Sequence, residues 1–80
     1  MKTFPLQVLR INEIVYQGEV SAVNAPGSGG DLTILADHET MLSSLQSGTL
    51  TITKADNTEQ TIPIERGFLE ASNKNVTILL

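Results

Sequence analysis

Apolar and polar side chains alternate strictly in the middle of the chain. In residues 49–65, TLTITKADNTEQTIPIE, leucine or isoleucine occupies every second position before and after a polar stretch. Because successive side chains of a β-strand point to opposite faces, this period of two predicts two strands with one buried and one wet face. A turn at Asp56 and Asn57 joins them into a hairpin. The predicted apolar face consists of Leu50, Ile52, Ile62 and Ile64.

Pro63 restricts where the second strand of this hairpin can lie. Proline has no amide hydrogen and cannot donate a hydrogen bond to a neighbouring strand. We therefore expect this strand at the edge of a sheet or at a bulge, with the nitrogen of Pro63 facing outward.

Further strand signals recur at intervals of about ten residues, separated by turn-forming residues. The segment 4–11 predicts one strand, 14–25 predicts a strand pair or one bent strand with Gly18 at a bulge or bend, and 31–37 predicts a short strand. Residues 68–72 and 75–80 predict a closing hairpin. Its apolar side is predicted to include Phe68, Leu69, Val76, Ile78 and Leu80. The unbroken apolar run at 78–80 indicates burial on both sides.

Two segments do not follow this alternation. Residues 26–31, PGSGGD, combine proline with three glycines and predict a loop. Residues 38–48, HETMLSSLQSG, are the one candidate for a helical turn, which Gly48 would end. The spacing of Met41, Leu42 and Leu45 favours packing on the core, with a docking surface as the alternative. Short strands joined by turns predict an all-β fold, either a β-sandwich or a small barrel.

Composition excludes several classes of function. Eighty residues predict a single domain spanning 1–80. A net charge of −4 without a basic run argues against nucleic acid as a partner. The chain has no cysteine and one histidine, so we expect no metal centre and no cofactor. The segment MKTFPLQVLR has no signal-peptide core, and no apolar stretch approaches the ~20 residues of a membrane span.

No catalytic motif is complete. The glycines of PGSGGDL lack the spacing of a phosphate-binding loop, and Asp31 would repel phosphate. His38 and Glu39 resemble the start of a zinc-protease motif, but Leu42 stands where its second histidine is required. Ser43 and Ser44 lack the surroundings of an activated serine. We therefore expect no catalytic residue, and an enzyme is the least supported class.

Three carboxylates flank the strand predicted at 31–37, namely Asp31, Asp37 and Glu39. Carboxylate oxygens are suitable ligands for calcium, but this spacing is not that of an EF-hand loop. Acids at strand ends are more often simply solvated. A small calcium- or ligand-binding β-sandwich is the alternative function from a different class.

Two motifs resemble one known family, the amino-terminal domain of the epsilon subunit of F-type ATP synthase, called delta in mitochondria. That family typically has G-E-L-G-I-x-P-G-H-x-P-L-L-T-x-L-x-x-G followed by G-x-L-E-x-x-x-x-N-V-T-V-L. In this chain the corresponding segments are 30–48, GDLTILADHETMLSSLQSG, and 67–80, GFLEASNKNVTILL. The matching residues are Gly30, Leu32, Ile34, His38, Leu42, Leu45, Gly48, Gly67, Leu69, Glu70, Asn75, Val76, Thr77 and Leu79.

The chain departs from this pattern before and after His38. Thr33, Ala36, Asp37 and Thr40 stand where the family usually has Gly, Pro, Gly and Pro. The turn before His38 is therefore expected to be less tight than in the family.

The resemblance implies a flattened β-sandwich of short antiparallel strands without the family's carboxy-terminal helical hairpin. It implies a non-catalytic subunit of the central stalk that docks the gamma subunit to the membrane c ring. Gly30 and Asp31 correspond to the c-ring contact, and His38, Leu42 and Ser43 to the gamma contact. It also implies a peripheral location on the cytoplasmic face of a bacterial inner or plasma membrane, reached only through the complex.

Overall fold

The computed structural model describes residues 2–37 and 40–80. Within these residues the chain forms strands and turns, with no helix that would be able to cross a membrane. The all-β prediction is confirmed. The strands are β1 (Phe4–Arg10), β2 (Glu13–Gly27), β3 (Gly30–Leu35), β4 (Met41–Leu45), β5 (Gly48–Lys54), β6 (Glu59–Ile64), β7 (Gly67–Ala71) and β8 (Val76–Leu79).

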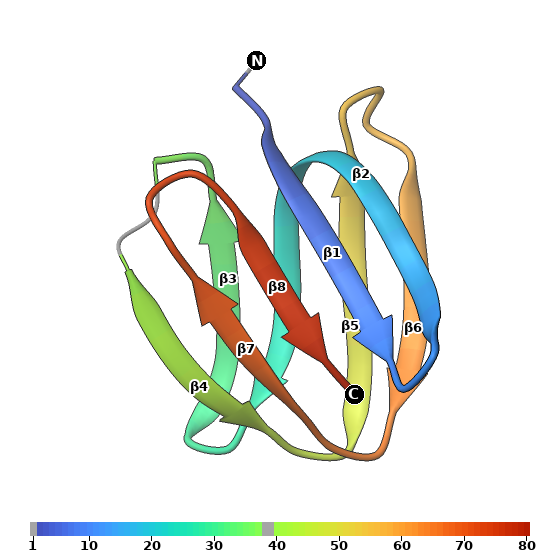
Figure 1. Cartoon of the computed structure of the whole chain (residues 1–80). Helices are drawn as coiled ribbons and strands as arrows, with labels where there is room; N and C mark the ends of the chain where they lie inside the picture. Colours follow the sequence, from blue (N-terminus) through green and yellow to red (C-terminus); the bar gives the residue numbers. More distant parts are fainter. Residues whose placement is uncertain (1, 38–39) are drawn as a thin grey trace.

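The strands form two facing layers (Figure 1). One layer has the order β1-β8-β7-β4, and the other has the order β3-β2-β5-β6. β2 contributes to both layers, because its first half pairs with β1 and its second half lies between β3 and β5. The result is a β-sandwich in which one long strand turns the corner between the layers.

The 15-residue length of β2 confirms the single-strand alternative for residues 14–25. The bend does not come from a bulge at Gly18. In the pairing with β1, Val15 is skipped, because Val8 pairs with Tyr16 and Leu9 pairs with Ile14. In the pairing with β5, the residue between Val20 and Ala22 is skipped. Each shift inserts an extra residue into β2, which increases the local bend and twist. Two bulges therefore flank Gly18.

The strand pairs are antiparallel, with one exception among the described residues. β1 and β8 run parallel, with Leu6 opposite Val76 and Val8 opposite Ile78. The expectation of short antiparallel strands therefore needs correction at the long β2 and at this pair.

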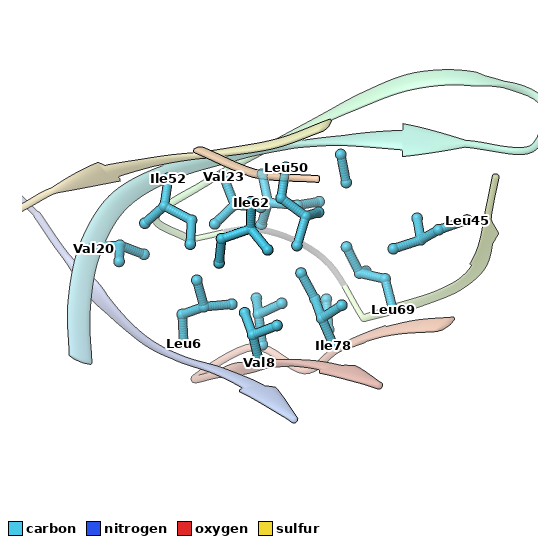
Figure 2. Packing of buried hydrophobic residues seen from close by; sticks show 14 of the residues in the cluster. Leu6, Val8, Val20, Val23, Leu45, Leu50, Ile52, Ile62, Leu69 and Ile78 are labelled. Atoms are coloured by element: carbon cyan, nitrogen blue, oxygen red, sulfur yellow. The ribbon is translucent and has the colours of Figure 1, made fainter. Parts of the chain in front are cut away.

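The core lies between the layers, and both contribute to it (Figure 2). The upper layer in this view supplies Val23, Leu50 and Ile52, and the lower layer supplies Leu6, Val8 and Ile78. Each of these six side chains is fully buried. All are apolar, and no polar or charged residue is buried among the described residues. Removal of this apolar surface from water is the main force that holds the layers together.

The hairpin of β5 and β6 forms as predicted. Leu50 pairs with Ile62, and their side chains are buried. Pro63 is exposed and lies on β6, the outermost strand of its layer, which confirms the edge position. At the turn, the Asp56 carboxylate accepts hydrogen bonds from the amide and hydroxyl of Thr58 at 3.0 and 2.6 Å. These bonds lower the pKa of Asp56 below its usual value of 3.8.

The helical turn predicted within residues 38–48 is wrong for its described part. Met41–Leu45 form strand β4, which pairs with β7 along its whole length. In an extended conformation Met41 packs against the core and Leu45 is buried, whereas Leu42 is exposed. Pairing with β7 thus overrides a spacing that also suits a helix. Leu42 is not a core residue.

The loop predicted at 26–31 is a tight turn. β2 continues to Gly27, Ser28 and Gly29 form the turn, and β3 starts at Gly30. Gly30 has φ of 131°, a value that side-chain-bearing residues rarely adopt. A Cβ atom on Gly27 would lie 2.6 Å from the Gly30 carbonyl oxygen. The glycines therefore permit a close backbone approach instead of an open loop.

The closing hairpin of β7 and β8 forms, but two of its apolar residues face outward. Leu69 and Ile78 are fully buried, whereas Phe68 is 41% exposed and Leu79 is 49% exposed. Strand geometry requires this, because neighbours on a strand cannot face the same side. The predicted burial of Phe68, and of Leu79 within the run at 78–80, is wrong.

Candidate functional site

Three exposed apolar side chains lie on the outer side of the layer β4-β7-β8. They are Leu42, Phe68 and Leu79, which are 63%, 41% and 49% exposed. Phe68 is paired directly with Leu79, and Leu42 is paired with Glu70. We call these three residues the apolar face. Exposed apolar side chains grouped on one side of a small domain indicate a protein interface.

The apolar face follows from the local sequence. Leu69 on β7 and Ile78 on β8 point into the core, so Phe68 and Leu79 must point out. The same alternation on β4 buries Leu45 and exposes Leu42. Sequence reasoning missed Phe68 and Leu79, although the adjacent apolar pairs 68–69 and 78–79 require one member of each pair to leave the core.

Gly30 and Asp31 lie at one end of the sandwich, beside the turn between β2 and β3. The turn is tied to the end of β4. The amide of Ser28 donates to the Ser44 carbonyl at 3.0 Å, and the two hydroxyls are 2.9 Å apart. We call residues 28–31 with Ser44 the loop end. The carboxylate of Asp31 is exposed there.

The five residues of the predicted contacts are placed differently. Gly30 and Asp31 come together at the loop end, and Leu42 lies in the apolar face. Ser43 is half-buried on the other side of β4, with its hydroxyl donating to the Ser44 carbonyl at 3.1 Å. Ser43 therefore does not share the face of Leu42. His38 lies outside the described residues.

The outer side of the other layer carries a row of polar side chains, with one exposed leucine, Leu35, at the end of β3. The paired residues Thr33, Asn24, Thr51 and Thr61 form a row across β3, β2, β5 and β6. The side-chain amide of Asn24 donates to the hydroxyl of Thr33 at 3.0 Å. We call these four residues the threonine face. Its hydroxyl groups remain accessible to water and need no protein partner.

The carboxylates considered for calcium do not come together. Asp31 is at the start of β3 and Asp37 follows its end, so about six strand residues, roughly 20 Å, separate them. Asp37 instead accepts a hydrogen bond from Lys2 at 2.6 Å, which raises the pKa of Lys2. Glu39 lies outside the described residues. No group of three potential metal ligands occurs within 2–37 and 40–80.

Two of the hollows that the described residues form are open to the surface. The first, of about 360 Å³, is lined by residues of β1, β2 and β8, including Gln7, Gln17 and Thr77. The second, of about 480 Å³, is lined by residues that include Arg10 and Arg66. Neither contains a serine, cysteine or histidine.

Comparison with known proteins gives a consistent result. The family model for the ATP synthase, Delta/Epsilon chain, beta-sandwich domain matches residues 3–80. The ATP synthase epsilon chain of Sulfurimonas denitrificans is 31% identical over 80 residues, covering 100% of this chain and 62% of the relative. That of Bradyrhizobium sp. is 39% identical over 79 residues, covering 99% and 58%. The chain thus spans about three fifths of the length of these relatives.

Solved structures support the fold. A chain of the Euglena gracilis mitochondrial ATP synthase OSCP/F1/c-ring structure matches with a TM-score of 0.90 and 24% identity, covering 96% of this chain and 49% of that one. A chain of the Tetrahymena thermophila mitochondrial ATP synthase central stalk/c-ring structure matches with a TM-score of 0.77 and 15% identity, covering 98% and 63%. With the same fold in these structures and a family match over residues 3–80, this chain belongs to the ATP synthase delta/epsilon β-sandwich domain family.

Proposed function

We propose that this chain is a non-catalytic docking module of the ATP synthase central stalk. In this proposal the gamma subunit covers the apolar face, and the c ring meets the loop end. The observation that carries it is the apolar face itself, where Leu42, Phe68 and Leu79 are exposed above an otherwise complete core. Relatives named ATP synthase epsilon chain supply the identity of the assembly.

The apolar face suits a permanent partner. The fold gains nothing from exposing three large apolar side chains, whereas a partner that covers them removes apolar surface from water. The face is also adjacent to charge, because Glu70 lies opposite Leu42 on the same side of the layer. An apolar centre with a charged rim is the usual composition of a stable interface.

The loop end suits a polar contact. Asp31 presents a carboxylate to solvent, and complementary charge on a partner would orient the contact. The hydrogen bonds from Ser28 to Ser44 join the turn of one layer to a strand of the other. A turn held in this way can transmit force to the sandwich without first deforming.

In this proposal the chain acts as a docking module because it binds rigidly through two surfaces. A subunit that joins two parts of a rotor needs two separate surfaces on a stiff body, and the apolar face and the loop end supply them. Coupling of ion translocation to ATP synthesis would then require no substrate of its own. The chain would be held at the cytoplasmic side of a bacterial membrane solely through the complex.

The test is binding to purified gamma subunit, measured by calorimetry. Leu42→Asp places a charge in the apolar face and is expected to weaken binding at least tenfold without lowering the melting temperature. Thr51→Asp introduces the same charge on the threonine face and should leave the affinity unchanged. Equal affinity of both variants and the unmodified chain would overturn the assigned face.

A further inference from the structure

β4 has a long open edge. On one side it pairs with β7 over all five of its residues, from Met41 to Leu45. On the other side, within residues 2–37 and 40–80, it pairs with β2 only through Leu45, which lies opposite Gly27. β4 is therefore an outer strand of its layer for most of its length (Figure 1).

The hydrogen bonds at the end of β4 show which of its main-chain groups point to this edge. The carbonyl of Ser44 accepts from the amide of Ser28 at 3.0 Å, away from β7. Main-chain groups of a strand alternate between its two edges, so Leu42 points to the same side as Ser44. The amide and carbonyl of Leu42 thus face the open edge, beyond the reach of β2.

The opposite edge of the sandwich is protected, and this one is not. β6 carries Pro63, which has no amide to offer, and begins with the charged Glu59. Such residues discourage an added strand. β4 has the sequence MLSSL, without charge, proline or glycine. An unprotected edge on a small domain is a template for pairing with another chain.

We propose that an extended segment of the gamma subunit pairs with β4 and continues the layer beyond it. This rests on the proposed function, because it specifies how the same partner binds. Leu42 belongs to both surfaces, since its side chain is in the apolar face and its main chain is at the open edge. A partner that covers the side chain of Leu42 is therefore next to its unpaired amide.

The partner segment has a defined chemistry. A strand added to β4 places every second side chain on the outer side of the layer, level with Leu42 and Ser44. Apolar residues there would extend the apolar face, and the absence of charge on β4 favours uncharged residues opposite it. We expect at least three consecutive extended residues in the segment, enough to pair with 41–43.

Hydrogen exchange at single amides tests this directly. We expect the Leu42 amide to exchange quickly in the free chain and at least tenfold more slowly in the complex with gamma. The Ser43 amide points toward β7 and serves as an internal control that is protected in both states. Unchanged exchange at Leu42 in a formed complex overturns strand pairing while leaving the proposed function intact. Absence of any complex overturns both.

Two substitutions separate the main chain from the side chain. Leu42→Ala removes the apolar contact and keeps the amide, whereas Leu42→Pro removes both. Strand pairing predicts that Leu42→Pro loses at least fivefold more affinity for gamma than Leu42→Ala, and equal losses overturn it. Thr61→Pro is the matched control, because the amide of Thr61 also faces outward, next to Pro63 on β6. It should bind gamma normally.

Exchange in the free chain also identifies the occupant. If protection of the Leu42 amide rises with the concentration of the chain alone, two β4 edges pair with each other, and the assignment of the edge to gamma is overturned. This measurement does not depend on a substitution, so it remains decisive if Leu42→Pro fails to fold.

Discussion

The two outer faces of the sandwich rest on the same alternation but differ in chemistry. Across β3, β2, β5 and β6, the outward positions include the polar row Thr33, Asn24, Thr51 and Thr61, with one exposed leucine, Leu35, at the end of β3. Across β4, β7 and β8, they include Leu42, Phe68 and Leu79. Both layers contribute equally apolar residues to the core, so folding does not require this difference. The side with three exposed large apolar residues is the one that we propose meets a partner.

Threonine is stable on the outer face of a strand without a protein partner. Its branched side chain favours the extended backbone, and its hydroxyl is satisfied by water or by a neighbour, as Thr33 is by Asn24. Leucine and phenylalanine suit a strand equally well but leave apolar surface in water. The contrast therefore separates residues that suit the fold and water from residues whose exposed apolar surface a partner would cover.

The largest expected effect is on the free energy of unfolding, and it distinguishes the buried side of β7 from its exposed side. Leu69→Ala removes a fully buried side chain and should lower the free energy of unfolding by about 2–5 kcal/mol. Phe68→Ala changes the next residue, which is 41% exposed, and should cost about 1 kcal/mol or less. Denaturant titration of both variants measures the difference. Similar losses would mean that Phe68 is part of the core.

The next effect concerns binding by the two faces. Replacing Phe68 and Leu79 together by serine makes the apolar face polar and should weaken gamma binding at least tenfold, or about 1.4 kcal/mol. Replacing Thr51 and Thr61 together by serine keeps the threonine face polar and should leave gamma binding unchanged. Calorimetry with each double variant provides the comparison. Loss of binding in the threonine pair would remove the distinction between the faces.

A smaller effect is expected at the loop end. Asp31→Lys reverses an exposed charge and should reduce retention on membranes that contain the c ring by a few-fold. The same variant should bind gamma with nearly unchanged affinity, because Asp31 lies at the end of the sandwich and not in the apolar face. Cosedimentation and calorimetry measure the two partners separately. Equal losses for both would argue against two separate surfaces.

The smallest effect is at the turn between β5 and β6, far from either proposed contact. Hydrogen bonds from Thr58 hold the pKa of Asp56 below 3.8, so the ionised carboxylate stabilises the folded state at neutral pH. This contribution is lost as pH falls through the lowered pKa. Thermal melting of Asp56→Asn should therefore depend less on pH below about pH 4 than that of the unmodified chain. If the melting temperatures of both chains depend equally on pH, protonation of Asp56 does not affect the stability of the fold.

Alternation made part of the fold predictable. A hairpin with one buried face is specified by the alternating residues Leu50, Ile52, Ile62 and Ile64. Its position at the edge of the layer is specified by Pro63. Both hold because they depend on local geometry. The segment 41–45 was less determined, since its spacing suits one helical turn as well as a strand. Pairing with β7, in which Met41 lies opposite Ala71, thirty residues later in the chain, decided between them.

The candidate site was predictable only in part. The resemblance to a known family directed attention to Leu42 and to Asp31, and the structure places both at the surface. It also turns Ser43 to the other side of β4, while His38 lies outside the described residues. Phe68 and Leu79 emerged only when pairing placed them side by side. Each pair of adjacent apolar residues, 68–69 and 78–79, indicated that one member faces outward. The sequence did not indicate that the two strands would be neighbours.

By itself the sequence determined the local rules of this protein: where strands run, where glycine permits a turn, and which residues share a face of one strand. These depend on backbone sterics and on a period of two, which act over a few residues. The tertiary structure decided which strands lie side by side, and with that the apolar face, the open edge of β4 and the joining of Ser28 to Ser44. Such features combine residues distant in the sequence, so they exist only when the layers have packed around one core.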